Sequence, residues 1–299
     1  MKKTEPSNSE GTSLGATLMS FYQLTKPGIT LYVMLTAGVS HYVAAQGNFN
    51  YVTLTEMLIG IALGSAGALC LNQYLERDLD ALMLRTQSRP LPSGNLQPHE
   101  ALWFGTCLVL GGTLYLALTI GVLPATLTIM SAGIYLFAYT PLKTRSYLAT
   151  LVGAIPGALP VLIGWSSATG SIEFGSMLIF GIAFLWQLPH VLALSWLLRE
   201  DYSRVGFLLT PHTDPNGKQI GKHMVYHSGA LLFVSGFPTL IGLTGWLYLV
   251  GSVALGMVTL SLSILAARNM TKVSARKIFL WSLVYQPLLL GLLMIDTIS

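Results

Sequence analysis

Asn72, Glu76 and Asp80 are an amide and two carboxylates spaced four residues apart, where an apolar run from Met57 to Leu71 meets a polar segment. Residues four apart stay on one face of an α-helix, so the three side chains form a stripe at the helix end, with Asp78 turned away. The stripe is roughly 12 Å long, too long for one small ion to contact all three side chains on a regular helix. The spacing therefore favours an elongated anionic ligand held through metal ions.

The basic residues beside this stripe strengthen the interpretation. Arg77, Arg85 and Arg89 follow it directly, whereas an ordinary interfacial helix could simply end in solvated acids. Carboxylates bind Mg²⁺, and guanidinium groups bind phosphate, so the cluster is typical of a diphosphate site. With an apolar channel beside it, the site would suit an allylic diphosphate, whose C–O bond breaks once the leaving charge is neutralised. A carbocation then needs a dry aromatic pocket, for which several residues are available: Tyr22, Tyr74, Tyr139, Trp165 and Trp186.

The composition identifies the elements that must position these groups. The chain has 299 residues, of which 53% are hydrophobic and only 9% charged, and its mean hydropathy is +0.62. A typical soluble domain has roughly 25% charged residues, so this chain is expected to be an all-α integral membrane protein around a cytoplasm-facing cavity. Apolar stretches of about 20 residues predict nine transmembrane helices. They cover roughly 29–46, 53–75, 100–121, 122–139, 148–169, 172–197, 224–244, 247–267 and 277–297.

The basic residues predict the orientation. All 16 lysines and arginines fall on one side of the nine-span arrangement, which by the positive-inside rule is cytoplasmic, with the N-terminus inside and the C-terminus outside. The pI near 9.0 thus reflects topology and does not indicate nucleic-acid binding. Residues 1–20 lack the apolar core of a signal peptide and are expected to be a disordered cytoplasmic tail before a single transmembrane domain, 21–299. Cys70 and Cys107 lie in predicted spans, which argues against a disulfide framework or a zinc site.

Two cytoplasmic loops, 77–98 and 200–222, are longer than a helical bundle needs. Both begin with acids directly at a helix end, which predicts a weak two-part pseudo-repeat facing one cavity.

The motifs resemble a known family. The stretch from Asn72 to Gly94, with Arg85-Thr-Gln-Ser-Arg89-Pro90, is similar to the first signature of the UbiA-type intramembrane prenyltransferases, in the version used by protohaem IX farnesyltransferases. Four shorter segments are also similar: Leu24-Thr-Lys26-Pro27, Tyr139-Thr-Pro-Leu-Lys143, Gly164-Trp165-Ser-Ser-Ala-Thr-Gly170, and Trp186-Gln187-Leu-Pro189-His190 with Asp201-Tyr202.

The resemblance implies a UbiA-like bundle of nine helices in the bacterial inner (plasma) membrane. It implies transfer of a farnesyl group from farnesyl diphosphate to a vinyl group of haem b, with water completing the addition to give haem O for terminal oxidases. A homo-oligomer, or a haem A synthase or terminal oxidase as assembly partner, fits such a role. Carried over by position, Asn72, Glu76 and Asp80 would be the catalytic Mg²⁺ and diphosphate ligands, and Arg85, Arg89 and Lys143 would face the diphosphate.

Two positions depart from the family pattern. Glu76 stands where the superfamily often has Asp, and it can still bind Mg²⁺ from one methylene further away. Other branches carry a second Asp-x-x-x-Asp stripe, whereas the sixth span here offers Gln187 and His190. Acids follow only at Glu200 and Asp201, and Asp201 is the better candidate for a catalytic metal ligand in this half.

His190 follows Pro189 inside an apolar span. A buried histidine is usually structural, but an ionisable group inside a membrane is commonly functional. In a haem-modifying enzyme it could ligate iron or orient the porphyrin, and Trp186 and Gln187 are the haem-binding candidates beside it. His41, near the outer end of the first span, is a weaker candidate.

Three other functions remain open at this stage. A prenyltransferase of the same class could use an aromatic quinone precursor as acceptor. A secondary transporter also has many spans with membrane acids, but its site usually lies near the bilayer midplane, not at the cytoplasmic edge. A non-catalytic haem-binding assembly factor would leave the acidic and basic cluster unexplained.

Overall fold

The computed structural model describes residues 14–209 and 214–298, and helices make up nearly all of this part of the chain. Eight segments in it are long and apolar enough to cross a membrane, so the chain is a multi-pass membrane protein. They are α2 (Pro27–Ala45), α3 (Tyr51–Asp80), α4 (Pro98–Thr119), the continuous stretch Val122–Leu142, α7 (Ala149–Thr169), α8 (Phe174–Leu197), α12 (Trp246–Arg268) and α13 (Lys272–Ile295).

The expected span 224–244 is the one that differs. It overlaps α10 (Lys218–Val234) and α11 (Phe237–Leu240), which are separated by a turn at Ser235 and Gly236. Pro238 has no N–H to continue the helix across this turn. The helical fold class is confirmed, and the count of nine spans stays a prediction.

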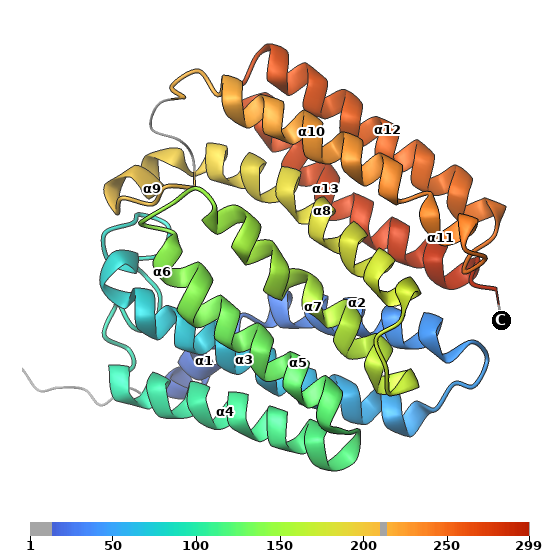
Figure 1. Ribbon diagram of the computed structural model, residues 1–299. Helices are drawn as coiled ribbons and strands as arrows, with labels where there is room; N and C mark the ends of the chain where they lie inside the picture. The colour runs from blue at the N-terminus through green and yellow to red at the C-terminus, as the bar shows by residue number, and fades with distance from the viewer. Residues whose placement is uncertain (1–13, 210–213, 299) are drawn as a thin grey trace, which may run out of the picture.

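The helices pack in two groups (Figure 1). In one group α2, α3, α4, α5 (Val122–Gly133) and α7 contact one another, and in the other α10, α12 and α13 pack with α8. The groups meet where α7 contacts α8 and α2 contacts α13. Glycines permit close helix approach: a Cβ at Gly67 would meet the backbone of α4, and a Cβ at Gly164 would meet the carbonyl group of Ala37.

The expected boundary between the third and fourth spans is confirmed. α4 ends at Thr119, and α5 begins at Val122 after Gly121, whose φ of 147° is a conformation that glycine adopts readily.

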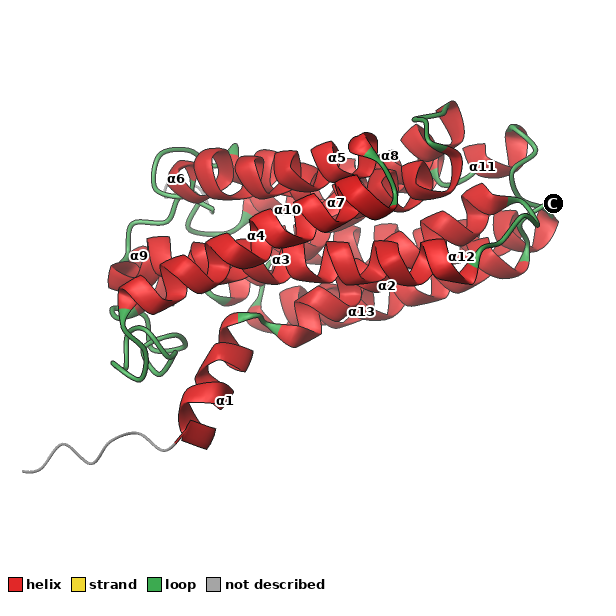
Figure 2. Ribbon diagram, turned by 90° about the horizontal axis from the view of Figure 1, so that it is seen from below, coloured by secondary structure: helices red, strands yellow, loops and turns green. Residues whose placement is uncertain are grey.

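α1 (Leu14–Leu24) precedes the bundle and leans away from it (Figure 2). It begins before residue 20, where the expected disordered tail would end. The helix is ordered by packing, because the Phe21 ring contacts that of Phe104 with centroids 4.9 Å apart and Leu24 is fully buried beside Cys70. Residues 1–13 of the expected tail lie outside the described residues.

A short π-helix interrupts the fourth span. η1 (Ile134–Tyr139) lies between α5 and α6 (Thr140–Leu142). Pro141 cannot donate an α-helical hydrogen bond to the carbonyl group of Phe137, and the Thr140 hydroxyl instead donates to the carbonyl of Tyr135 at 2.8 Å. The wider turn stacks the rings of Tyr135 and Tyr139, with centroids 5.5 Å apart.

Two loops and a short helix gather at one end of the bundle. The loop after α3, the loop after α6 and α9 (Arg199–Arg204) lie there, while the C-terminus lies at the opposite end (Figures 1 and 2). Met83 from the loop after α3 and Tyr202 from α9 belong to one hydrophobic cluster, against which Leu79 of α3 and Leu142 of α6 pack.

Candidate active site

The acidic stripe of α3 is buried and paired with cations. Asn72, Glu76 and Asp80 are 1%, 5% and 1% exposed, so they are not solvated acids at an ordinary helix end. The Lys143 ammonium donates to Glu76 Oε1 at 2.6 Å, and Arg89 Nη1 donates to Asp80 Oδ2 at 2.6 Å. The structure therefore brings together five of the site residues predicted from the sequence. They are Asn72, Glu76 and Asp80 of α3, Arg89 of the loop after it, and Lys143, which follows α6.

Asp80 retains capacity for a further ligand. Its Oδ1 atom is buried and has no hydrogen-bond partner among the described residues. A buried, unpaired carboxylate oxygen is costly, and a hard cation such as Mg²⁺ would satisfy it. The oxygen atoms of Asn72, Glu76 and Asp80 are the donor types that Mg²⁺ prefers, so the chemistry of this stripe fits magnesium ions.

A second network connects the stripe to the π-helix. The Asn72 amide donates to the Thr140 hydroxyl at 3.0 Å and accepts from the Tyr135 hydroxyl at 3.2 Å. The Lys143 ammonium lies 4.6 Å from the centre of the Tyr139 ring, a cation–π distance. Tyr135 and Tyr139 thus contact the polar cluster directly.

The segment that begins at Glu200 contributes less directly to the site than expected. Asp201 Oδ1 accepts a hydrogen bond from the Leu84 backbone N–H at 3.4 Å and lies 3.8 Å from Arg204, so it links α9 to the loop after α3. Within 14–209 and 214–298, no cluster of three or more His, Cys, Asp or Glu side chains could hold a metal ion. Arg85 is exposed in the same loop. Metal binding by Asp201 and diphosphate binding by Arg85 stay predictions.

Lys26 is a site residue that the sequence reasoning did not select. It precedes α2 in a left-handed conformation, with φ of 45°, which is uncommon for a residue with a side chain. Burial, together with the nearby charges of Arg89 and Lys143, lowers its pKa from 10.5 to about 7, against the opposing effect of Glu76 and Asp80. Lys26 therefore belongs to the same charge cluster. The sequence feature that could have identified Lys26 is its position directly before Pro27, which opens an apolar span.

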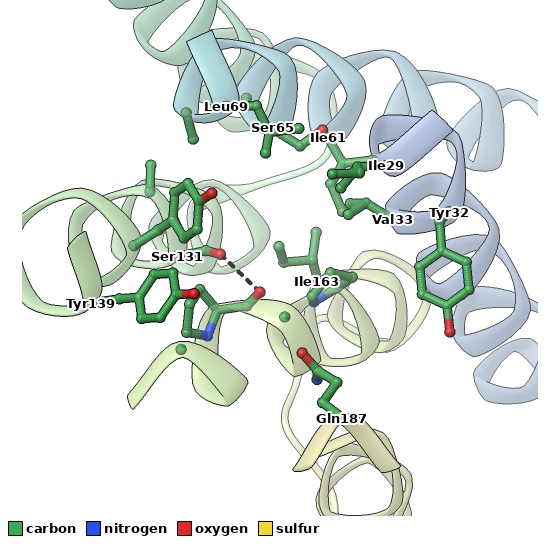
Figure 3. A pocket seen from close by; sticks show the side chains of 18 of the residues that line it. Ile29, Tyr32, Val33, Ile61, Ser65, Leu69, Ser131, Tyr139, Ile163 and Gln187 are labelled. Carbon is green, nitrogen blue, oxygen red and sulfur yellow. Dashed lines mark hydrogen bonds between the residues drawn. The ribbon is translucent and has the colours of Figure 1, made fainter. Parts of the chain in front are cut away.

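A cavity of about 510 Å³ lies between the helices beside this cluster. Its wall includes Tyr135 and Tyr139 at the polar cluster, and mostly apolar groups of α2, α3, α5, α7 and α8 elsewhere. In Figure 3, Tyr139 and Tyr32 lie on opposite sides of the cavity, with Gln187 between them on a third wall. A charged cluster beside a largely apolar cavity can hold a ligand that is anionic at one end and apolar at the other.

The predicted haem-binding residues all line this cavity. All three come from α8: Trp186, Gln187 and His190. Gln187 Nε2 donates to the carbonyl groups of Ala154 in α7 and Ala183 in α8. Trp186 stacks on Tyr32, with ring centroids 5.6 Å apart. Two of the five aromatic residues offered as cation stabilisers, Tyr139 and Trp186, are in the wall, and Tyr32 and Tyr135 join them.

Comparison with known proteins agrees with this arrangement. Residues 33–284 match the UbiA prenyltransferase family. A protein named protoheme IX farnesyltransferase from Solibacter usitatus is 38% identical over 288 residues, which cover 93% of this chain and 99% of that protein. A protein of the same name from Opitutus terrae is 36% identical over 282 residues, covering 94% and 95%.

Solved structures share the fold at low identity. One, described as digeranylgeranylglyceryl phosphate synthase, has a TM-score of 0.79 at 14% identity, covering 94% of this chain and 99% of that one. A UbiA homologue from Archaeoglobus fulgidus bound to GPP and Mg²⁺ has a TM-score of 0.64 at 14% identity, covering 92% and 99%. The resemblance seen in the motifs is confirmed: this chain belongs to the UbiA prenyltransferase family.

Proposed function

We propose that this protein transfers the farnesyl group of farnesyl diphosphate to a vinyl group of haem b, giving haem O. The observation that carries the proposal is the buried pairing of Glu76 with Lys143 and of Asp80 with Arg89, beside a largely apolar cavity. Tyr135 and Tyr139 contact this cluster and also line the cavity. The names of the relatives at 38% and 36% identity support haem as the acceptor.

The polar cluster would bind the diphosphate. Asn72, Glu76 and Asp80 would hold Mg²⁺, with the free Oδ1 atom of Asp80 as one ligand. Bound Mg²⁺ would supply charge neutralisation of the leaving diphosphate. An ammonium group has three N–H donors and a guanidinium group has five, so Lys143 and Arg89 can keep their carboxylate partners and still donate to phosphate oxygens. Asp201 and Arg85 would join from the covering loops once substrate is present.

The aromatic wall would protect the allylic cation. Tyr135 and Tyr139 contact the polar cluster and line the cavity, so their rings would lie beside the carbon that leaves the diphosphate. The hydrocarbon tail would occupy the apolar part of the cavity, which excludes bulk water from the cation until the vinyl carbon attacks it. Trp186, Gln187 and His190 would hold the porphyrin on the α8 wall.

The site would face the cytoplasm of a bacterial inner membrane. The loops beside the site carry Arg85, Arg89 and Lys143, and α9 ends at Arg204, whereas the turns at the opposite end of the bundle contain no lysine or arginine. By the positive-inside rule this supports an N-terminus inside and a C-terminus outside.

Product analysis tests the proposal. Purified protein is incubated with Mg²⁺ and farnesyl diphosphate plus either haem b or 4-hydroxybenzoate, and products are analysed by mass. We expect a heavier, more hydrophobic haem in the first reaction only. A prenylated benzoate would instead assign the chain to quinone-precursor chemistry. Substrate flux into sealed vesicles without any product would overturn the enzymatic role.

A further inference from the structure

Ser282 of α13 holds two side chains of α8 at once. Its hydroxyl oxygen lies 2.7 Å from His190 Nδ1, and its backbone carbonyl accepts a hydrogen bond from Trp186 Nε1 at 2.9 Å. Ser282 is 3% exposed, so these contacts are shielded from water. Trp186 and His190 are four residues apart and therefore share one face of α8, the face that also lines the cavity.

The hydrogen bonds define the tautomer of His190. The Ser282 hydroxyl has one proton, and it donates that proton to the carbonyl group of Phe279 at 2.6 Å. The same oxygen can then only accept from His190, so Nδ1 carries the ring proton. In a neutral imidazole with Nδ1 protonated, Nε2 has a free lone pair.

The ring is also held in orientation. His190 stacks on Trp186 with centroids 5.4 Å apart and packs against Phe279 at 5.0 Å on an inclined plane. Nδ1 is directed to α13, and Nε2 has no hydrogen-bond partner among the described residues, although His190 lines the cavity. Nε2 is therefore the ring nitrogen left for a ligand inside the cavity.

We infer that Ser282 is a positioning residue that presents His190 Nε2 as the axial ligand of the substrate haem iron. The inference deepens the proposed function and rests on it. Neutral imidazole nitrogen is a common haem iron ligand, and ligating histidines usually donate their other N–H to a fixed acceptor. Trp186, held by the same serine, stacks on the His190 ring and keeps the plane of the imidazole fixed.

His41 supplies a matched control within the same chain. Its Nδ1 lies 2.7 Å from Ser167 Oγ, and Ser167 in turn donates to the carbonyl group of Gly164 at 2.6 Å. This second histidine–serine pair has the same hydrogen-bond pattern, but His41 is 1% exposed and is absent from the wall of the 510 Å³ cavity. A purely structural role for such pairs would make the two sites respond alike.

The test compares haem b with metal-free protoporphyrin IX. Full-length protein and the variants His190→Ala, Ser282→Ala, Ser282→Thr and His41→Ala are titrated with each porphyrin, and the haem absorption spectrum is recorded. We expect Ser282→Ala to weaken haem binding by roughly tenfold and His190→Ala by at least that much, without changing the affinity for metal-free protoporphyrin. Ser282→Thr keeps the hydroxyl and should bind as the parent does. Added imidazole should restore the parent haem spectrum to His190→Ala.

The outcomes separate the inference from the proposed function. Equal losses for both porphyrins, or unchanged haem binding and spectrum in His190→Ala, would overturn iron ligation. Unchanged haem binding in His190→Ala would leave Nε2 as a proton acceptor for the water that completes the addition. His41→Ala should match the parent throughout, and a haem-specific loss there would also contradict the inference. Haem O formation by the parent protein is measured separately, so its absence would refute the proposed function and not the tautomer assignment.

Discussion

The Lys143 ammonium and the Glu76 carboxylate form a buried ion pair with a separation of 2.6 Å between Nζ and Oε1. Glu76 lies in α3 and Lys143 directly follows α6, far away in sequence, so the pair connects α3 to the end of the fourth span. Removing one partner of a buried pair leaves an uncompensated charge, whereas replacing both partners can be nearly neutral. This pair can therefore be tested for its structural and its functional contribution separately.

The first prediction concerns this pair. Glu76→Gln and Lys143→Met should each destabilise the protein by about 3–5 kcal/mol, because each leaves a buried charge without its partner. The double variant should recover most of that stability, as measured by the thermal unfolding midpoint in detergent. It should remain inactive, since a metal ligand and a diphosphate-binding cation are both lost. A stable and active double variant would remove the pair from the proposed chemistry.

Asp80→Asn should abolish most haem O formation. Asparagine cannot neutralise Arg89 and is a weaker Mg²⁺ ligand, so we expect a loss on the order of 10²–10³-fold in turnover. Asp78→Asn is the matched control, because Asp78 lies two residues away and its side chain is 84% exposed. Size-exclusion profiles of both variants check folding. Full activity in Asp80→Asn would refute the metal role of this residue.

Lys26 should make diphosphate binding depend on pH. Its pKa of about 7 means that the free protein holds a mostly neutral amine at pH 8, and a bound anion favours the charged form. Binding should then take up a proton, so affinity should be nearly constant below pH 7 and fall by up to about tenfold per pH unit above it. Calorimetry in buffers of different ionisation enthalpy, with farnesyl diphosphate and no acceptor, measures the uptake. Lys26→Met should abolish this component, and an unchanged pH profile would exclude Lys26 as its source.

Gly157→Ala should reduce activity by displacing Gln187. A Cβ at this position would overlap the side-chain amide of Gln187, which must then move within the cavity. We expect weaker haem binding in porphyrin titrations, and Gly157→Ala combined with Gln187→Ala should regain the space. Gly111→Ala is the control, because a Cβ there meets nothing within 4 Å. Equal effects of the two glycine substitutions would attribute the loss to the helix backbone.

Much of the fold and part of the site could be predicted from the sequence. The apolar runs identify the membrane helices because a spanning segment must satisfy its own backbone hydrogen bonds, and only the break at Ser235 and Gly236 escaped that criterion. The spacing of Asn72, Glu76 and Asp80 indicated one helix face because helical geometry is local. The helix at residues 14–24 was missed because its order depends on contacts with Phe104 and Cys70, which are distant in sequence.

The sequence by itself determined the class of protein, the membrane helices and the acidic stripe, since hydrophobicity and helical periodicity act over short stretches of chain. Only the tertiary structure decided which cation meets which carboxylate, that Lys26 joins the cluster, and that Asp201 contacts the backbone of Leu84. It also decided that Ser282 meets His190 while Ser167 meets His41. These pairings join helices separated by many residues, and their geometry follows from how the helices pack, which no local spacing encodes.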